Sequence, residues 1–140
     1  MISQKKEAFT LMEVMLAVVI IGVLSTLVVP GIIKKMRNMK INTTMHTMAA
    51  LKSALMDYNQ DVGHFPSAEE GNLKALLKRP RGIKKWDGPY IENTVDVPTD
   101  EWNNDFEYNK TPKKYKNIYK FYEIISDGPE DAEEDIHTGQ

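Results

Sequence analysis

A single acid lies near the start of a long apolar stretch: Glu13 is followed by residues 14–33, which carry no charge. A carboxylate in hydrocarbon costs about 2.5–3.5 kcal/mol on insertion scales, so such a residue usually has a partner and a role. A cut between Ala8 and Phe9 would create an α-amine four residues before Glu13. That amine and the Glu13 carboxylate of a neighbouring subunit could pair inside an assembly. The alternative is that Glu13 lies at the membrane interface, in contact with water.

A second group of candidate residues lies near the C-terminus, where six of the nine residues 127–135 are acidic. Calcium takes several oxygen ligands at about 2.3–2.6 Å, and a turn dense in carboxylates supplies them. The segment is not an EF-hand, because the ligand spacing and the glycine at the sixth position do not match. The alternative is a solvated, partly disordered tail.

The sequence offers no catalytic constellation. The histidines His46, His64 and His137 are scattered, and none lies in an H-E-x-x-H or triad-like motif. G-x-S-x-G and phosphate-loop motifs are absent, and so are cysteines, which excludes disulfides and thiolate metal sites. The net charge of −2, without a basic–aromatic stripe, argues against nucleic-acid binding. We expect a protein that is not an enzyme.

The elements that position these residues begin with a membrane-length helix. Twenty residues at about 1.5 Å each extend roughly 30 Å, the thickness of a bilayer core. The apolar run exceeds the 7–15 residues of a secretory signal core, so we expect it to stay on the mature protein. Counting the lysines and arginines on each side of the run favours an N-terminus outside the cytoplasm.

The remaining pattern predicts an α+β fold. An apolar stripe of helical period predicts one helix over about residues 10–60, kinked at Pro30. A capping box of Ser67 and Glu70 predicts a short second helix. Residues 106–108 and 118–125 are predicted strands, joined by a connection at 111–114, and Trp86 and Tyr90 are expected to anchor the irregular segment between helix and strands.

The start of the chain resembles the type IV prepilin signature: a short basic leader, a small residue, then Phe9-Thr-Leu-x-Glu13 and an apolar helix with Pro30. The resemblance implies that a prepilin peptidase removes residues 1–8, cutting between Ala8 and Phe9, and methylates the Phe9 amine. It also implies that Glu13 forms the assembly salt bridge. The family usually has glycine before the cut, where this chain has Ala8.

Two further segments, residues 64–71 and 86–91, resemble the major pseudopilin of type II secretion. Adhesion or DNA-uptake pilins and minor pilins are the alternative within the superfamily, and a membrane-anchored periplasmic enzyme is the alternative outside it. The resemblance implies a transmembrane and filament-core helix at 9–33, a periplasmic pilin-like domain at 34–136 packed on a small antiparallel sheet, and a tail at 137–140. It further implies a cytoplasmic N-terminus, against the charge count.

The resemblance also implies partners and a cofactor. The partners are further copies in a helical filament, minor pseudopilins, the inner-membrane secretion platform with its ATPase, and the prepilin peptidase. The cofactor is structural calcium, with Asp127 and Asp135 as side-chain ligands and Ile124 as a carbonyl ligand. Two features depart from the family here: the usual glycine pair in this loop is missing, and residues 100–106 read Asp-Glu-Trp-Asn-Asn-Asp-Phe instead of Asp-Pro-Trp-Gly-Asn-Pro-Tyr.

Overall fold

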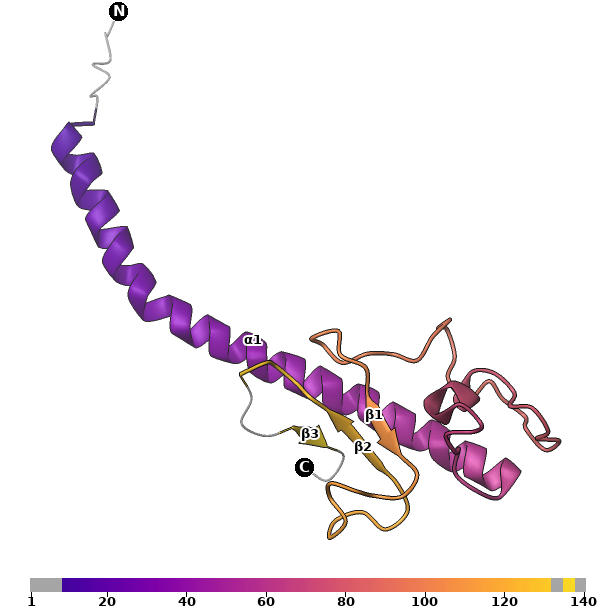
Figure 1. Ribbon diagram of the computed structural model, residues 1–140. Coiled ribbons are helices and arrows are strands. Elements are labelled where there is room, and N and C mark those ends of the chain that lie inside the picture. The colour runs from indigo at the N-terminus through magenta and orange to yellow at the C-terminus, as the bar shows by residue number, and fades with distance from the viewer. Residues whose placement is uncertain (1–8, 132–134, 138–140) are drawn as a thin grey trace, which may run out of the picture. The chain divides into compact units, whose positions relative to one another are not determined.

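A computed structural model of the protein describes residues 9–131 and 135–137. Within them the elements are the α-helix α1 (Leu11–Val62), the 3-10 helix η1 (Asn72–Leu76) and the strands β1 (Glu107–Asn109), β2 (Glu123–Ser126) and β3 (Ile136–His137) (Figure 1). The expected α+β class, with one long N-terminal helix and a small antiparallel sheet, is confirmed. The chain divides into two compact units, with the boundary after Asn38.

The first unit is the N-terminal part of α1. Its best 18-residue window has a mean hydropathy of 2.7 and no buried residue, so length and composition suit a membrane span. The helix continues through Pro30 without ending. Proline has no N–H, so the carbonyl of Thr26, four residues earlier, loses its usual helical donor. The helix bounds confirm the predicted range, and the kink stays a prediction.

In the second unit, the C-terminal part of α1 packs on η1 and the sheet. The apolar stripe predicted from Met36 to Tyr58 is confirmed at Met48, Leu51, Leu55 and Tyr58, which are buried. Ile41 and Met45 pack partly buried against the core, whereas Met36 is exposed. Thr44 is also fully buried, and its hydroxyl accepts the Glu101 N–H at 3.2 Å. A stripe defined by apolar residues alone omits such a threonine. The core side chains are Met48, Leu51, Ala54, Leu55, Tyr58, Leu73, Ala75, Leu76, Phe106, Tyr108, Tyr122, Ile124 and Ile136.

The sheet is small and antiparallel, in the order β1-β2-β3. Tyr108 lies opposite Ile124, and Ser126 lies opposite Ile136. The central strand β2 is buried along its whole length because it has a neighbour on each side. The third strand reaches His137, one residue past the expected end of the domain at residue 136.

The predicted short second helix is present as the 3-10 helix η1, which begins at Asn72, later than the capping signal at Ser67 predicts. Half of the capping box forms, since the Ser67 N–H donates to Glu70 Oε2 at 2.8 Å. The other carboxylate oxygen, Glu70 Oε1, lies 2.7 Å from His64 Nε2. Gly71 and Asn72 then have φ values of 95° and 53°. Left-handed residues end an α-helix. The segment from Asn72 therefore forms the more tightly wound 3-10 helix η1.

The predicted strand at 118–125 was wrong over its first half, because only Glu123–Ser126 is strand. The N–H groups of Ile118 and Tyr119 both donate to the Tyr115 carbonyl at 3.0 Å, which makes a turn. Just before this turn, the N–H groups of residues 113–115 donate to the Glu123 carboxylate, as described below. These N–H groups are therefore not available for hydrogen bonds to a neighbouring strand. The connection between β1 and β2 is consequently a long loop.

The segment between η1 and β1 is anchored by Trp86 and Tyr90, as expected. Trp86 Nε1 donates to the Ala75 carbonyl at 2.8 Å, and the Tyr90 hydroxyl donates to Asp61 at 2.8 Å. Gly88 lies between the two rings: a Cβ there would be 2.7 Å from Trp86 Cζ2 and 2.8 Å from Tyr90 Cδ2. The glycine is therefore needed for the rings to approach.

Candidate functional site

The first site is the N-terminus of α1, where Thr10 and Glu13 form a capping box. The Glu13 N–H donates to Thr10 Oγ1 at 3.2 Å, and Glu13 Oε2 accepts from the Thr10 N–H at 2.8 Å and from the Thr10 hydroxyl at 3.0 Å. Each residue thus satisfies a backbone donor of the other. Phe9 is exposed just before the cap, and Ala8 lies outside the described residues.

This cap was not predicted, although its signal, a threonine three residues before a glutamate, is visible in the sequence. The structure gives the Glu13 carboxylate partners within its own chain. Pairing with a neighbouring subunit's amine stays a prediction, and it would compete with these bonds for the same carboxylate.

Beyond the cap, α1 presents an apolar surface. The large side chains between Leu11 and Ile33 are exposed, and the two hydroxyls in the run are turned back onto the helix. Ser25 Oγ donates to the Ile21 carbonyl and Thr26 Oγ1 to the Val23 carbonyl, both at 2.7 Å. This part of α1 can therefore lie in hydrocarbon, or against other apolar helices, without leaving these hydroxyls unpaired.

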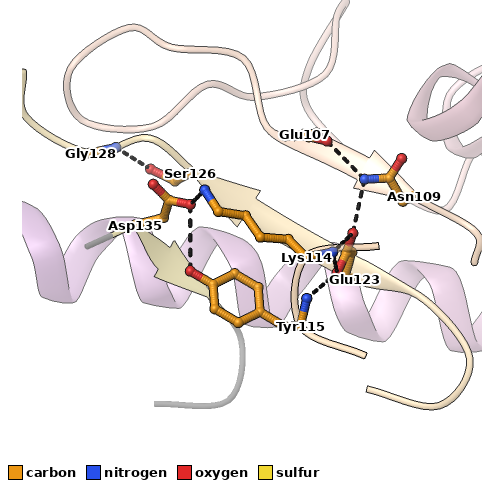
Figure 2. A network of polar contacts seen from close by, with 8 residues as sticks. All are labelled: Glu107, Asn109, Lys114, Tyr115, Glu123, Ser126, Gly128 and Asp135. Carbon is orange, nitrogen blue, oxygen red and sulfur yellow. Dashed lines mark hydrogen bonds and ion pairs between the residues drawn. The ribbon is translucent and has the colours of Figure 1, made fainter. Parts of the chain in front are cut away.

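The second site is built around Glu123, a fully buried acid in β2. The backbone of the β1–β2 loop wraps its carboxylate (Figure 2): the N–H groups of Lys113 and Tyr115 donate at 2.8 and 3.0 Å, and that of Lys114 lies 3.2 Å from both oxygens. Asn109 Nδ2 donates from β1 at 3.0 Å. One buried carboxylate therefore fixes a loop that has no regular structure.

These donors determine the charge of Glu123. Burial alone would raise the pKa of the Glu123 carboxyl, but the hydrogen bonds from the loop backbone and Asn109 outweigh it, and the net pKa is lowered. The alternating pattern predicts Glu123 only as one residue of a strand, and this role was not predicted. The available signal was an acid between the apolar residues Tyr122 and Ile124.

The side chain of Lys114 reaches a different acid. Its Nζ forms an ion pair with Asp135, the residue before β3 (Figure 2). The pKa of Lys114 is raised, chiefly by the hydrogen bond to Asp135, with the charge of Asp127 also contributing. Lys114 therefore bonds Glu123 through its backbone and Asp135 through its side chain.

These contacts bear on the predicted calcium ligands. Asp135 is already paired with an ammonium, Asp127 is exposed, and Ile124 is buried in the middle of β2. Among the described residues, no three His, Asp or Glu side chains form a group that could hold a metal ion. The loop residues Ala132, Glu133 and Glu134 lie outside the described residues. The described donor set does not fit a calcium ion, which needs six or more oxygens.

The stretch that departs from the family pattern is tied down by Asp100, which is almost fully buried. Its carboxylate accepts from Ser126 Oγ at 2.7 Å, from the N–H groups of Trp102 and Asn104 at 2.9 and 2.8 Å, and from Asn104 Nδ2 at 3.0 Å. Burial alone would raise the pKa of the Asp100 carboxyl. These hydrogen bonds lower the pKa by more, so the net pKa is below its ordinary value. Asn104 also donates to the Gly128 carbonyl at 2.9 Å. These protein groups thus hold the turn after β2.

Comparisons with known proteins bear on both units. A family model described as "Type II secretion system (T2SS), protein G" matches residues 31–138, and one described as "Prokaryotic N-terminal methylation motif" matches residues 3–29. The type II secretion system core protein G of Pseudomonas aeruginosa is 33% identical over 132 residues, covering 91% of this chain and 88% of the relative. The core protein G of Aeromonas hydrophila is 30% identical over 137 residues, covering 95% and 92%.

A solved structure gives the same answer for the fold. The crystal structure of the major pseudopilin from the type 2 secretion system of enterohaemorrhagic Escherichia coli superposes with a TM-score of 0.60 at 26% identity. The match covers 79% of this chain and 95% of that one. Family model, relatives and structure agree, and this chain belongs to the type II secretion system protein G family.

Proposed function

We propose that this protein is the structural subunit of a type II secretion pseudopilus, the filament that drives export of folded proteins across the outer membrane. The observation that carries the proposal is the protein G family match over residues 31–138, joined to an exposed apolar helix of membrane length. No catalytic step is assigned, because the buried acids Asp100 and Glu123 are both saturated by donors of the fold.

The apolar part of α1 has two environments in this proposal. Before assembly it anchors the subunit in the inner membrane by a single pass, with a cytoplasmic N-terminus and a periplasmic domain. In the filament the same surface packs against the helices of neighbouring copies. The exposed apolar side chains and the inward-bonded hydroxyls of Ser25 and Thr26 support both environments.

Maturation precedes assembly in the proposal. A prepilin peptidase cuts between Ala8 and Phe9 and methylates the new Phe9 amine, as the N-terminal methylation motif over residues 3–29 supports. The Glu13 carboxylate of one subunit then pairs with the amine of the next. Minor pseudopilins and the inner-membrane platform are the further partners that a pseudopilus requires.

Gene deletion tests the function. We expect loss of secreted proteins from the medium, with surface pili intact, and restoration by the wild-type gene. The reverse pattern, intact secretion and lost pili, would instead assign the protein to adhesive or motility filaments.

Two variants separate pairing from helix capping. Glu13→Ala should be cut at Ala8 but assemble poorly, because the neighbour's amine is left without its partner in an apolar environment. Thr10→Val removes only the capping hydroxyl and keeps the carboxylate, so it should assemble at least as well as wild type. Filament yield after crosslinking measures the assembly of both variants. Normal assembly of Glu13→Ala, or equal failure of both variants, contradicts the pairing.

A further inference from the structure

Lys114 joins two parts of the domain that are far apart in sequence. Its backbone N–H is one of the donors on Glu123 in the central strand, and its ammonium pairs with Asp135 at the start of the last strand (Figure 2). The strand β3 has only two residues, paired through Ile125 and Ser126. Few ladder hydrogen bonds hold the C-terminal segment, so contacts at its entry matter for its position.

The same ammonium lies among the residues that the family resemblance assigns to calcium. Asp135 is its direct partner, and Asp127 is near enough for its charge to stabilise the protonated lysine. A positive charge is thus already supplied by the chain where a divalent cation was expected. A calcium ion would have to displace Lys114 from Asp135, and it would meet repulsion from the ammonium nearby.

The turn after β2 is also held by protein groups. Ser126 Oγ donates to Asp100 at 2.7 Å and accepts the Gly128 N–H at 3.1 Å, while Asn104 reaches the Gly128 carbonyl. These contacts use Asp100 and Asn104, which agree with the family pattern, whereas the differences in that stretch are at residues 101, 103, 105 and 106. The departure that coincides with a contact of this chain is the C-terminal loop, which lacks the usual glycine pair and where Lys114 pairs with Asp135.

We propose that Lys114 replaces calcium in this protein, and that its ammonium holds the acidic C-terminal segment to the β1–β2 loop, so that the domain reaches full stability without a metal ion. The proposal goes beyond the filament role and does not depend on it.

A calcium titration of the wild-type chain is the direct test. The full chain is purified in detergent, and thermal unfolding is followed by circular dichroism in EGTA, in calcium chloride and in magnesium chloride at equal ionic strength. We expect the midpoints in calcium and EGTA to agree within about 1 °C, since a ligand that does not bind the native state cannot stabilise it. A calcium-specific increase of several degrees overturns the proposal.

Substitution of Lys114 supplies the second measurement. Lys114→Met keeps the apolar stem and removes the charge, and we expect its midpoint in EGTA to fall by about 2–4 °C, because the pair is partly exposed. Lys113→Met is the matched control, since that neighbour is exposed and bonds Glu123 only through its backbone. Lys114→Arg should restore the midpoint. Equal effects of Lys114→Met and Lys113→Met, or an unchanged Lys114→Met, overturn the role of the ammonium.

Discussion

Glu123 illustrates how one side chain can organise a loop without regular structure. Its carboxylate is fully buried and receives N–H groups from three consecutive residues, Lys113 to Tyr115, together with the Asn109 amide. Hydrogen bonds to a charged acceptor are about twice as strong as neutral ones. The loop therefore depends on the negative charge as well as on the shape of the side chain.

We expect Glu123→Gln to lower the free energy of unfolding by about 2–3 kcal/mol, because the amide brings an NH₂ group against backbone donors and removes the charge they solvate. Urea unfolding measures the change. Glu92→Gln, the same substitution at an exposed position away from the Glu123 carboxylate, is the control and should stay within about 0.5 kcal/mol of wild type. A Glu123→Gln variant as stable as this control would contradict the charge-dependent role.

The elements differ in how far local sequence determines them. The bounds of α1 follow from apolar periodicity and were predicted closely. The short second helix was predicted to start at a Ser67 cap, because the capping signal was visible and the left-handed backbone at Gly71 and Asn72, which delays the helix, was not. The early part of the predicted second strand is replaced by a turn, in which the N–H groups of Ile118 and Tyr119 donate to the Tyr115 carbonyl. The aromatic and β-branched composition that predicted a strand there did not reveal this turn.

The segment around Trp86 gives a test at the level of an element. We expect Gly88→Ala to destabilise the domain by about 1–3 kcal/mol, because the added methyl would press against the rings of Trp86 and Tyr90 and displace their bonds to Ala75 and Asp61. Thermal unfolding and tryptophan fluorescence follow the change. Asp87→Ala is the control, since the Asp87 backbone N–H that contacts Tyr90 remains. Equal stability of both variants would show that the ring approach is not required.

At the scale of the whole domain, three carboxylates among the described residues after Asn38 make stability depend on pH. Burial raises the pKa of Glu70, Asp100 and Glu123, but their hydrogen bonds, from His64 and Ser67 in the case of Glu70, outweigh it and leave each pKa lowered. A lowered folded-state pKa means that the unfolded chain takes up protons first as the pH falls. The stabilisation is complete above the unfolded values of about 4 and is lost below them.

We therefore expect the free energy of unfolding to be level between pH 7 and about pH 5, and to fall steeply as the pH drops through 4 towards 3. Urea titrations of the full chain in detergent at each pH measure this. Glu123→Gln should show a shallower fall, because one of the three groups no longer titrates. A level stability down to pH 3 would contradict the lowered pKa values.

The two candidate sites were predictable to different degrees. The N-terminal one is local: Phe9 and Glu13 lie within five residues, and their types and spacing suffice to place them at a helix start. The C-terminal one depends on Lys114 meeting Asp135, residues 21 positions apart on opposite sides of β2. The count of acids there left calcium and a solvated tail as alternatives, since nothing in the spacing indicated which lysine the sheet would bring to them.

The cap at Thr10 and Glu13 has a consequence for polymerisation. Under the proposed pairing, a subunit whose glutamate is already bonded joins a filament by exchanging partners, and only the difference between two satisfied states contributes to the equilibrium. The gain per added subunit is then smaller than that from an unbonded carboxylate. Growth stays closer to reversible, and the critical concentration can be tuned at Thr10 while the intersubunit contact itself is left unchanged.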